Sequence, residues 1–276
     1  MHIRLLLVFS FIFYCVRIRT NPANYFQLNA PFFNKSKGIF SKLDIDRLIP
    51  QRWQLRQNAD NGLVTDFQFP VFVKPEWGQN AYGIRRADSL AELDDIRRQS
   101  ADSKMPRIIQ EAANEAREFE VFFILSAADE SRAAVLTVSE ALNVVKKKLP
   151  INSINNANTF YQELTDSLSV EQLDAIWQHM RSFGRFGISR VGLRADSIDA
   201  MVKGDFHVIE INLFVPMPIN LLDPSKTLRQ KVTTVLNTTW HLAQIVKHIP
   251  AEQEHQSVFF KKWLVARKVK MLPQTL

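Results

Sequence analysis

Residues 207–213 read HVIEINL, an apolar run in which Glu210 and Asn212 stand two positions apart. A run of this length and composition is typical of a β-strand, on which alternate side chains point to the same face. Acidic side chains are rarely buried without a partner. The pattern therefore indicates a strand that presents one carboxylate and one amide to a common site.

A second polar pair precedes this run. Residues 188–193 predict a strand that leads into Arg194-Ala195-Asp196, so Arg194 and Asp196 also share one face. Asp196, Glu210 and Asn212 together form an oxygen-ligand set suited to Mg²⁺, which usually binds substrate phosphates as well. A purely structural ion pair between Arg194 and Glu210 is the alternative.

A lysine and two glycines suggest phosphate binding earlier in the chain. Residues 69–75, FPVFVKP, predict a strand that ends near Lys74, and the loop WGQNAYG follows at 77–83. Glycine lets backbone N–H groups approach a phosphate, and lysine adds a mobile charge. The loop matches neither G-x-x-x-x-G-K-[ST] nor G-x-G-x-x-G, and a surface hairpin would have the same pattern.

Carboxylates also mark the middle of the chain. Residues 107–111 predict a short strand, and residues 118–125, EFEVFFIL, predict another on which Glu118 and Glu120 share a face. Two carboxylates on one face favour binding of hydroxyl groups or a cation. A solvated outer face of an antiparallel strand is equally consistent with the pattern.

The remaining pattern predicts an α+β fold. Helices are expected from Ser89 to about Gln99, after Ser169 and from about Thr227 to Ile249, and further strands at 84–86 and 133–142. Residues 143–166 form a polar segment with three lysines at 146–148, which predicts a long loop or lid. Strands and helices do not alternate strictly, so a doubly wound parallel sheet is not favoured.

Composition limits the class of protein. The chain has 276 residues, a net charge of +7 and a single cysteine, Cys15, which excludes an intramolecular disulfide framework. The apolar run at 5–16 is too short to cross a bilayer as a helix and lacks a small-residue cleavage site. It predicts a buried element or a surface-lying anchor. The six histidines show no metal-ligand spacing.

Taken in order, these clusters resemble the ATP-grasp superfamily over roughly residues 42–220, in particular its D-alanine–D-alanine-ligase-like carboxylate–amine and carboxylate–thiol ligases. The resemblance implies two α+β subdomains that clasp ATP. It implies ATP-binding positions at Lys42, Lys74, Gly78, Gly83, Gln110, Glu111, Ala113, Glu118 and Glu120. It also implies Mg²⁺, or Mn²⁺, on Asp196, Glu210 and Asn212, and a catalytic Arg194 that faces the reacting carboxyl phosphate.

The same resemblance suggests a division of the chain. We expect an apolar leader at 1–20, a reduced N-terminal region at 21–66, an ATP-grasp domain at 67–250 and a basic amphipathic tail at 251–276. Within the ATP-grasp domain, the nucleotide-clasping subdomain would cover about 67–125 and the catalytic and metal subdomain about 126–250. Residues 213–224, LFVPMPINLLDP, lack the small Ser and Gly residues with which dipeptide ligases receive a second substrate. This difference argues against D-alanine as a substrate.

The implied activity is an ADP-forming, ATP- and Mg²⁺-dependent ligase. A small-molecule carboxylate would become an acyl phosphate that an amine or thiol attacks. Two alternatives remain open: a kinase with a hydroxyl acceptor, and a non-catalytic, membrane-associated ATP-binding module supported by the leader and the tail. Nucleic-acid binding rests on net charge alone and is not expected. Use of ATP predicts a cytoplasmic location, with peripheral attachment to the inner membrane face left open.

Overall fold

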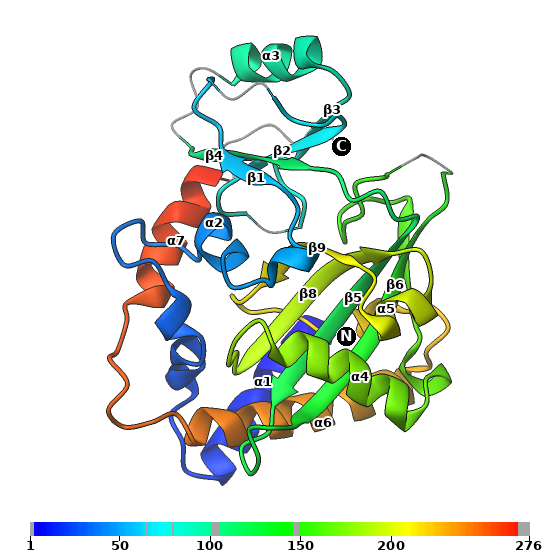
Figure 1. Cartoon of the computed structure of the whole chain (residues 1–276). Coiled ribbons are helices and arrows are strands. Elements are labelled where there is room, and N and C mark those ends of the chain that lie inside the picture. Colours follow the sequence, from blue (N-terminus) through cyan, green and yellow to red (C-terminus); the bar gives the residue numbers. More distant parts are fainter. Residues whose placement is uncertain (1–2, 64–65, 79, 101–104, 146–148, 270–276) are drawn as a thin grey trace.

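Two antiparallel sheets form the framework of the protein in the computed structural model (Figure 1). The structure describes residues 3–63, 66–78, 80–100, 105–145 and 149–269. The smaller sheet has the order β1-β4-β2-β3 and the larger sheet the order β7-β6-β5-β8-β9. The strands are β1 (Gln57–Ala59), β2 (Val71–Pro75), β3 (Arg85–Ala87), β4 (Arg107–Glu111), β5 (Arg117–Leu125), β6 (Ala133–Asn143), β7 (Thr159–Glu163), β8 (Ile188–Ala195) and β9 (His207–Asn212). The predicted α+β class is confirmed.

Helices and short 3₁₀ turns complete the fold. The α-helices are α1 (Ile3–Arg17), α2 (Lys42–Asp46), α3 (Leu90–Gln99), α4 (Val170–Arg181), α5 (Ile198–Lys203), α6 (Leu228–Lys247) and α7 (Val258–Val269). The 3₁₀ turns are η1 (Pro22–Gln27), η2 (Ala30–Phe32), η3 (Gln51–Trp53), η4 (Thr165–Ser167) and η5 (Ile219–Leu222).

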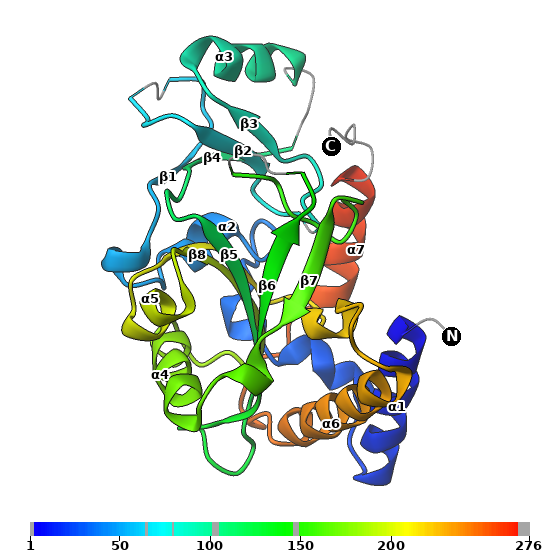
Figure 2. The ribbon, with the colours of Figure 1, turned by 90° about the vertical axis from the view of Figure 1, so that its right-hand side faces the viewer.

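The smaller sheet is covered on its outer side by α3 (Figures 1 and 2). Ser89 caps this helix by accepting a hydrogen bond from the Glu92 N–H, as the sequence predicts. Leu93 and Ile96 of α3 are buried with Val73 and Ile109 of the sheet in a core of their own. The smaller sheet therefore does not depend on the larger one for its apolar core.

The larger sheet buries one face against α4. Strand alternation places Phe119, Val121 and Phe123 of β5 on this face, and the Phe123 ring packs edge-on against Trp177 of α4 at 5.3 Å. Ser169 and Gln172 form a capping box that starts α4. The helix thus arises where the spacing of its apolar residues predicts it.

The opposite face of the larger sheet is shared between two neighbours. One end faces the smaller sheet, and the other lies over α1 and α6, which cross and pack against each other (Figure 2). Tyr14 of α1 packs edge-on against Trp240 of α6, with ring centroids 5.4 Å apart. The apolar run near the N-terminus is thus a helix packed against the domain, and it still exposes Phe9, Phe13 and Val16. Within the described residues, no helix is long and apolar enough to cross a membrane.

Some elements differ from the sequence-based expectations. The sequence did not predict β1, α2 or β7, and β7 lies inside the segment expected to be a loop. These elements have three to five residues, which is too short for a clear periodic pattern. Strand β5, grouped by sequence with the first subdomain, belongs to the larger sheet. The lysines at 146–148 lie outside the described residues.

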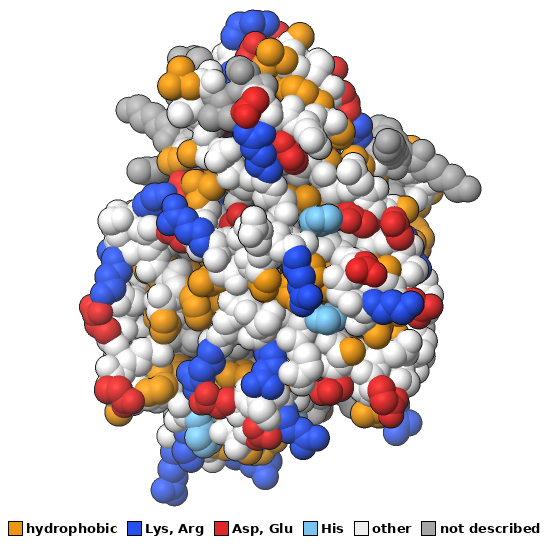
Figure 3. All heavy atoms as spheres, in the orientation of Figure 1, with side chains coloured by type: hydrophobic (Ala, Val, Ile, Leu, Met, Phe, Trp, Pro, Cys, Tyr) orange, Lys and Arg blue, Asp and Glu red, His pale blue; other side chains and the backbone are white. Residues whose placement is uncertain are grey.

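The C-terminal segment folds back along the N-terminal region. Phe259 of α7 packs against Phe26, with ring centroids 4.9 Å apart, and the Lys261 ammonium donates a hydrogen bond to the Lys35 carbonyl at 3.0 Å. Phe260, Trp263 and Leu264 expose half or more of their surface. On the face drawn in Figure 3, Lys and Arg side chains are interspersed with Asp and Glu.

Trp53 joins the N-terminal region to the larger sheet. It is 1% exposed, stacks on Phe206 at 4.7 Å, and donates an indole hydrogen bond to the Gly204 carbonyl at 2.7 Å. We expect Trp53→Ala to lower the free energy of unfolding by about 3–5 kcal/mol because it leaves a large cavity. Trp53→Phe keeps the stacked ring and should cost only about 1–2 kcal/mol. Urea unfolding measures both changes, and an unaltered midpoint for Trp53→Ala would contradict this account.

Candidate functional site

The polar face of the larger sheet brings distant acidic and basic residues together. Residues paired across antiparallel strands point to the same face. Glu120 of β5 pairs with Gly192 of β8, which in turn pairs with Glu210 of β9. Two register positions along, Arg190 pairs with Asn212. Glu118 lies on the same face of β5, two residues before Glu120, so both carboxylates share the face that carries Glu210 and Asn212.

Two lysines reach this face from outside the larger sheet. Lys74, in β2 of the smaller sheet, donates to Oε1 of Gln110 at 2.5 Å and to the Ile209 carbonyl of β9 at 3.4 Å. Lys42 starts α2 and donates to the carbonyls of Pro75 and Gly78 at 3.2 and 3.4 Å. Both ammonium groups therefore lie where the two sheets meet.

The charges at this junction influence one another strongly. Burial lowers the pKa of Lys42 to about 8, with a further lowering by Lys74, while Glu210 and Glu76 oppose it. Burial likewise lowers the pKa of Lys74, against the attraction of Glu210. Burial pushes the pKa of Glu210 upward, but Lys42, Arg190 and Lys74 together hold it below its ordinary value. Glu210 is therefore ionised at neutral pH.

The two carboxylates of β5 behave differently from Glu210. Burial raises the pKa of Glu118 to about 7, although Arg194 and a 3.1 Å hydrogen bond from Asn152 oppose the shift. Burial also raises the pKa of Glu120 to about 7, against the attraction of Arg190, which lies 3.2 Å away. Both carboxyl groups therefore change charge near neutral pH.

The raised pKa of Glu118 predicts a pH-dependent stability. Its pKa is about 7 in the folded protein, against an ordinary value of 4.5, so the folded state binds more protons between these pH values. The free energy of unfolding therefore falls as pH rises through this window. Between pH 5 and pH 8 the free energy of unfolding should fall by about 2 kcal/mol less in Glu118→Gln than in the unchanged protein. Urea unfolding at the two pH values measures this, and an identical loss in both proteins would count against it.

Arg194 lies further along β8 than Arg190 and pairs across the strands with Glu118, and Asp196 directly follows β8. The β8–β9 register pairs Glu210 with Gly192, four residues before Asp196. Asp196 is exposed, and its Oδ1 accepts a 2.9 Å hydrogen bond from the Ala116 N–H. The Arg194 guanidinium donates to the carbonyls of Glu115 and Ala116 at 2.9 and 3.0 Å. Arg194 thus contacts the connection between the sheets and faces Glu118, and Asp196 contacts the same connection.

Some of the predicted nucleotide-binding residues lie at the junction of the two sheets, and others do not. Gln110 is buried at the junction and Ala113 follows it on the connection between the sheets, whereas Glu111 pairs with Arg56 and accepts the Gln68 N–H. Gly78 contacts Lys42 through its carbonyl. Gly83 adopts a φ of +71°, which favours glycine. The two glycines therefore bound a loop beside the lysines, while the Glu111 side chain points elsewhere.

Sequence reasoning missed Arg190 and Asn152. Arg190 interrupts the apolar segment at 188–193, which is the same signal of a buried charge that marked Glu210. Asn152 lies within the segment that the sequence predicted to be a loop. No local pattern shows that this segment folds onto Glu118, so only the structure reveals the contact. The neighbouring Ser153 donates to the Asn80 carbonyl at 2.8 Å, so this segment also contacts the loop that carries Gly83.

The donor atoms fit a divalent cation that is shared with a nucleotide. In the part of the chain that the structure describes, no group of three or more His, Cys, Asp or Glu side chains could hold a metal alone. Glu210 is ionised and lies beside Asn212, whose amide donates to its Oε1 at 2.7 Å. Mg²⁺ commonly takes one or two protein oxygens and completes its shell with phosphates and water.

The family follows from the sequence comparison. Residues 35–217 match the family described as D-ala D-ala ligase C-terminus. The chain belongs to this family, so the predicted ATP-grasp relationship is confirmed. A search of curated proteins gave no match.

Solved structures resemble the chain at low sequence identity. The L-amino acid ligase from Bacillus licheniformis has 15% identity and a TM-score of 0.49, with 78% of this chain and 50% of that chain covered. The VanG D-Ala:D-Ser ligase from Enterococcus faecalis has 12% identity and a TM-score of 0.50, with 80% and 70% covered. The D-alanine–D-alanine ligase from Bacillus anthracis complexed with ATP has 12% identity and a TM-score of 0.44, with 81% and 67% covered. The chain thus spans about half the length of the first of these proteins.

Proposed function

We propose that this chain is an ADP-forming ligase that uses ATP and Mg²⁺ to activate a small-molecule carboxylate for attack by an amine or thiol. One observation carries the proposal: Lys42 and Lys74 meet a single sheet face that presents Arg190, Glu210 and Asn212. This combination provides cations for phosphates and oxygens for a divalent ion. Use of ATP also favours a cytoplasmic location.

In this proposal the triphosphate lies between the two sheets. Lys74 and Lys42 neutralise phosphate charge, and the loop bounded by Gly78 and Gly83 covers the phosphates from the side of the smaller sheet. The adenine lies near Gln110 and Ala113. Glu118 is retained as the residue that binds a ribose hydroxyl. Phosphoryl transfer depends mainly on such positioning and charge neutralisation.

Glu210 and Asn212 would hold Mg²⁺, which supplies charge neutralisation to the β- and γ-phosphates when it is bound. We propose these two residues without Asp196, because the β8–β9 register places Asp196 four residues past Gly192, the position that faces Glu210. Asn212 would present its amide oxygen to the ion while its Nδ2 keeps the hydrogen bond to Glu210.

Arg190 would hold the acid. Its guanidinium is paired with Glu120 on one side, and it has further donors in a fork geometry that suits a carboxylate. A carboxylate oxygen then attacks the γ-phosphorus, and the bond from that phosphorus to the β–γ bridging oxygen breaks to release ADP. An amine or thiol next attacks the acyl carbon, loses its proton, and displaces inorganic phosphate.

Trapping of the acyl phosphate tests the proposal. The full chain is incubated with ATP, Mg²⁺ and a panel of carboxylic acids, with hydroxylamine as the nucleophile. We expect ADP and an acyl hydroxamate in equal amounts for the acids that are substrates. A phosphorylated hydroxyl product would identify a kinase instead, and ATP binding without any ADP for the whole panel would identify a non-catalytic module.

A further inference from the structure

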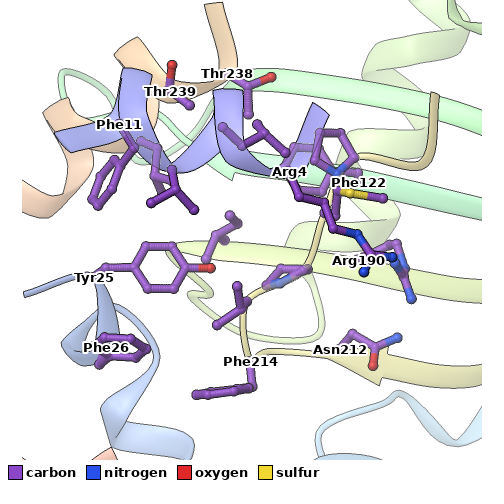
Figure 4. A pocket seen from close by; sticks show the side chains of 18 of the residues that line it. Arg4, Phe11, Tyr25, Phe26, Phe122, Arg190, Asn212, Phe214, Thr238 and Thr239 are labelled. Atoms are coloured by element: carbon purple, nitrogen blue, oxygen red, sulfur yellow. The ribbon is translucent and has the colours of Figure 1, made fainter. Parts of the chain in front are cut away.

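A large cavity lies beside the proposed reacting centre. It has a volume of about 680 Å³ and is lined by α1, α6, η1, the end of the polar sheet face and the segment that follows β9 (Figure 4). This volume lies within the range of small-molecule binding sites, about 300–1,000 Å³. Arg190 and Asn212 line both the cavity and the polar cluster. A molecule in the cavity can therefore reach the proposed site directly.

The cavity has one cationic side and one apolar side. Figure 4 shows Arg4, Arg190 and Asn212 together on one side, and Phe11, Tyr25 and Phe26 on the other. Leu7, Leu242 and Phe214 are among the other apolar side chains in the wall. Such walls favour the transfer of a hydrocarbon group out of water and offer little to a polar side chain.

Arg190 supplies the fixed polar contact. Its side chain is 12% exposed and lines the cavity, and its Nε lies 3.2 Å from Oε2 of Glu120. The ion pair with Glu120 engages one side of the guanidinium, and the remaining donors of its fork suit a carboxylate. An anionic group at Arg190 and an apolar body along the aromatic wall would satisfy both sides of the cavity at once.

We infer that the acid activated by this enzyme is an amphipathic carboxylic acid with a long apolar tail. This inference rests on the proposed function and names its substrate class. The carboxylate lies at Arg190, next to Asn212, and the tail extends between α1 and α6 toward Phe11 and Phe26. A small polar amino acid would leave most of the apolar wall in contact with water.

Equilibrium binding tests the inference without requiring turnover. The full chain is titrated with straight-chain carboxylic acids of four to twelve carbons by calorimetry. We expect the Kd to fall about fourfold for each added methylene that the cavity buries. Dodecanoate should also bind more tightly than dodecanol, because only the acid pairs with Arg190. A Kd that does not change with tail length would overturn the inference.

A matched pair of variants locates the tail. Ile12 lines the cavity and is 41% exposed, whereas Val16 lies on the same helix, does not line the cavity and is 67% exposed. Ile12→Trp should fill part of the cavity and weaken dodecanoate binding at least tenfold, with little effect on butanoate. Val16→Trp should bind as the unchanged protein does. Equal weakening by both variants would indicate adsorption to the outside of α1 and would contradict the inference.

Turnover separates this inference from the proposed function. With ATP, Mg²⁺ and hydroxylamine, kcat/KM should rise with tail length in parallel with binding. Binding of long acids that responds to Ile12→Trp, without any ADP, would support the cavity assignment and refute the ligase. Hydroxamate formed from short polar acids, without any gain for long ones, would support the ligase and refute the cavity assignment.

Discussion

The Lys74→Met variant is expected to lose about 10²–10³-fold in kcat for ADP formation. The Lys74 ammonium is buried, lies 2.5 Å from Oε1 of Gln110, and interacts electrostatically with Glu210 and Glu118. Methionine keeps most of the side-chain volume and removes the charge, so the triphosphate would meet the carboxylates of the larger sheet without neutralisation. The rate of ADP release at saturating acid measures the loss.

Two comparisons make the Lys74 result specific. Lys203→Met changes an exposed lysine at the end of α5 and should leave kcat unchanged. Lys74→Arg keeps a positive charge in a different shape and should retain more activity than Lys74→Met. Turnover by Lys74→Met within a few-fold of the unchanged protein would show that the phosphates bind elsewhere.

Glu210→Gln is the second variant with a large expected effect. The pKa of Glu210 lies below its ordinary value, so the residue is anionic, and the substitution removes this charge with almost no change in shape. We expect kcat to fall about 10²–10³-fold at fixed Mg²⁺, and the Mg²⁺ concentration for half-maximal rate to rise. A titration of activity against Mg²⁺ measures both quantities.

Asp196→Asn provides the matched comparison for Glu210→Gln, because both replace a carboxylate by its amide. Asp196 contacts the Ala116 N–H and is separated from Glu210 by the β8–β9 register. The Mg²⁺ requirement of Asp196→Asn should therefore stay close to that of the unchanged protein. If Asp196→Asn instead raised the Mg²⁺ requirement as strongly as Glu210→Gln, the three-ligand set predicted from sequence would be restored.

Local patterns were sufficient to predict most of the framework. Apolar runs predicted the strands at 107–111, 118–125 and 207–213, and spacing with caps predicted α3, α4 and α6. The same alternation indicated that Glu210 and Asn212 share a face, because strand geometry is a property of neighbouring residues. Lys74 and Glu118 were also identified, and both lie at the junction of the sheets.

The pairing of strands could not be predicted in the same way. Arg190 and Arg194 both lie on the polar face of β8, four residues apart, and only the register with β9 shows which one faces Asn212. A bulge between Gly192 and Leu193 shifts that register further. Register depends on contacts between distant segments. The sequence indicated that Glu210 and Asn212 share a face, and the roles that it gave to Arg194 and Asp196 stay predictions.

The cavity was also beyond the reach of local patterns. Its wall combines residues of α1 and α6, which are more than 200 positions apart in the sequence. The apolar run at 5–16 predicted a buried element or a surface anchor, and the structure shows a helix that packs against α6 on one side and is exposed on the other. Only the packing of α1 against α6 creates a space next to Arg190.

A crystal structure of the full chain with a non-hydrolysable ATP analogue and Mg²⁺ tests the central claim most directly. We expect the triphosphate to lie between the two sheets, in contact with Lys42 and Lys74. The metal ion should lie on Glu210 and Asn212, and the γ-phosphate beside Arg190. A nucleotide bound outside this junction, or a metal ion on Asp196 with Glu210 uninvolved, would contradict it.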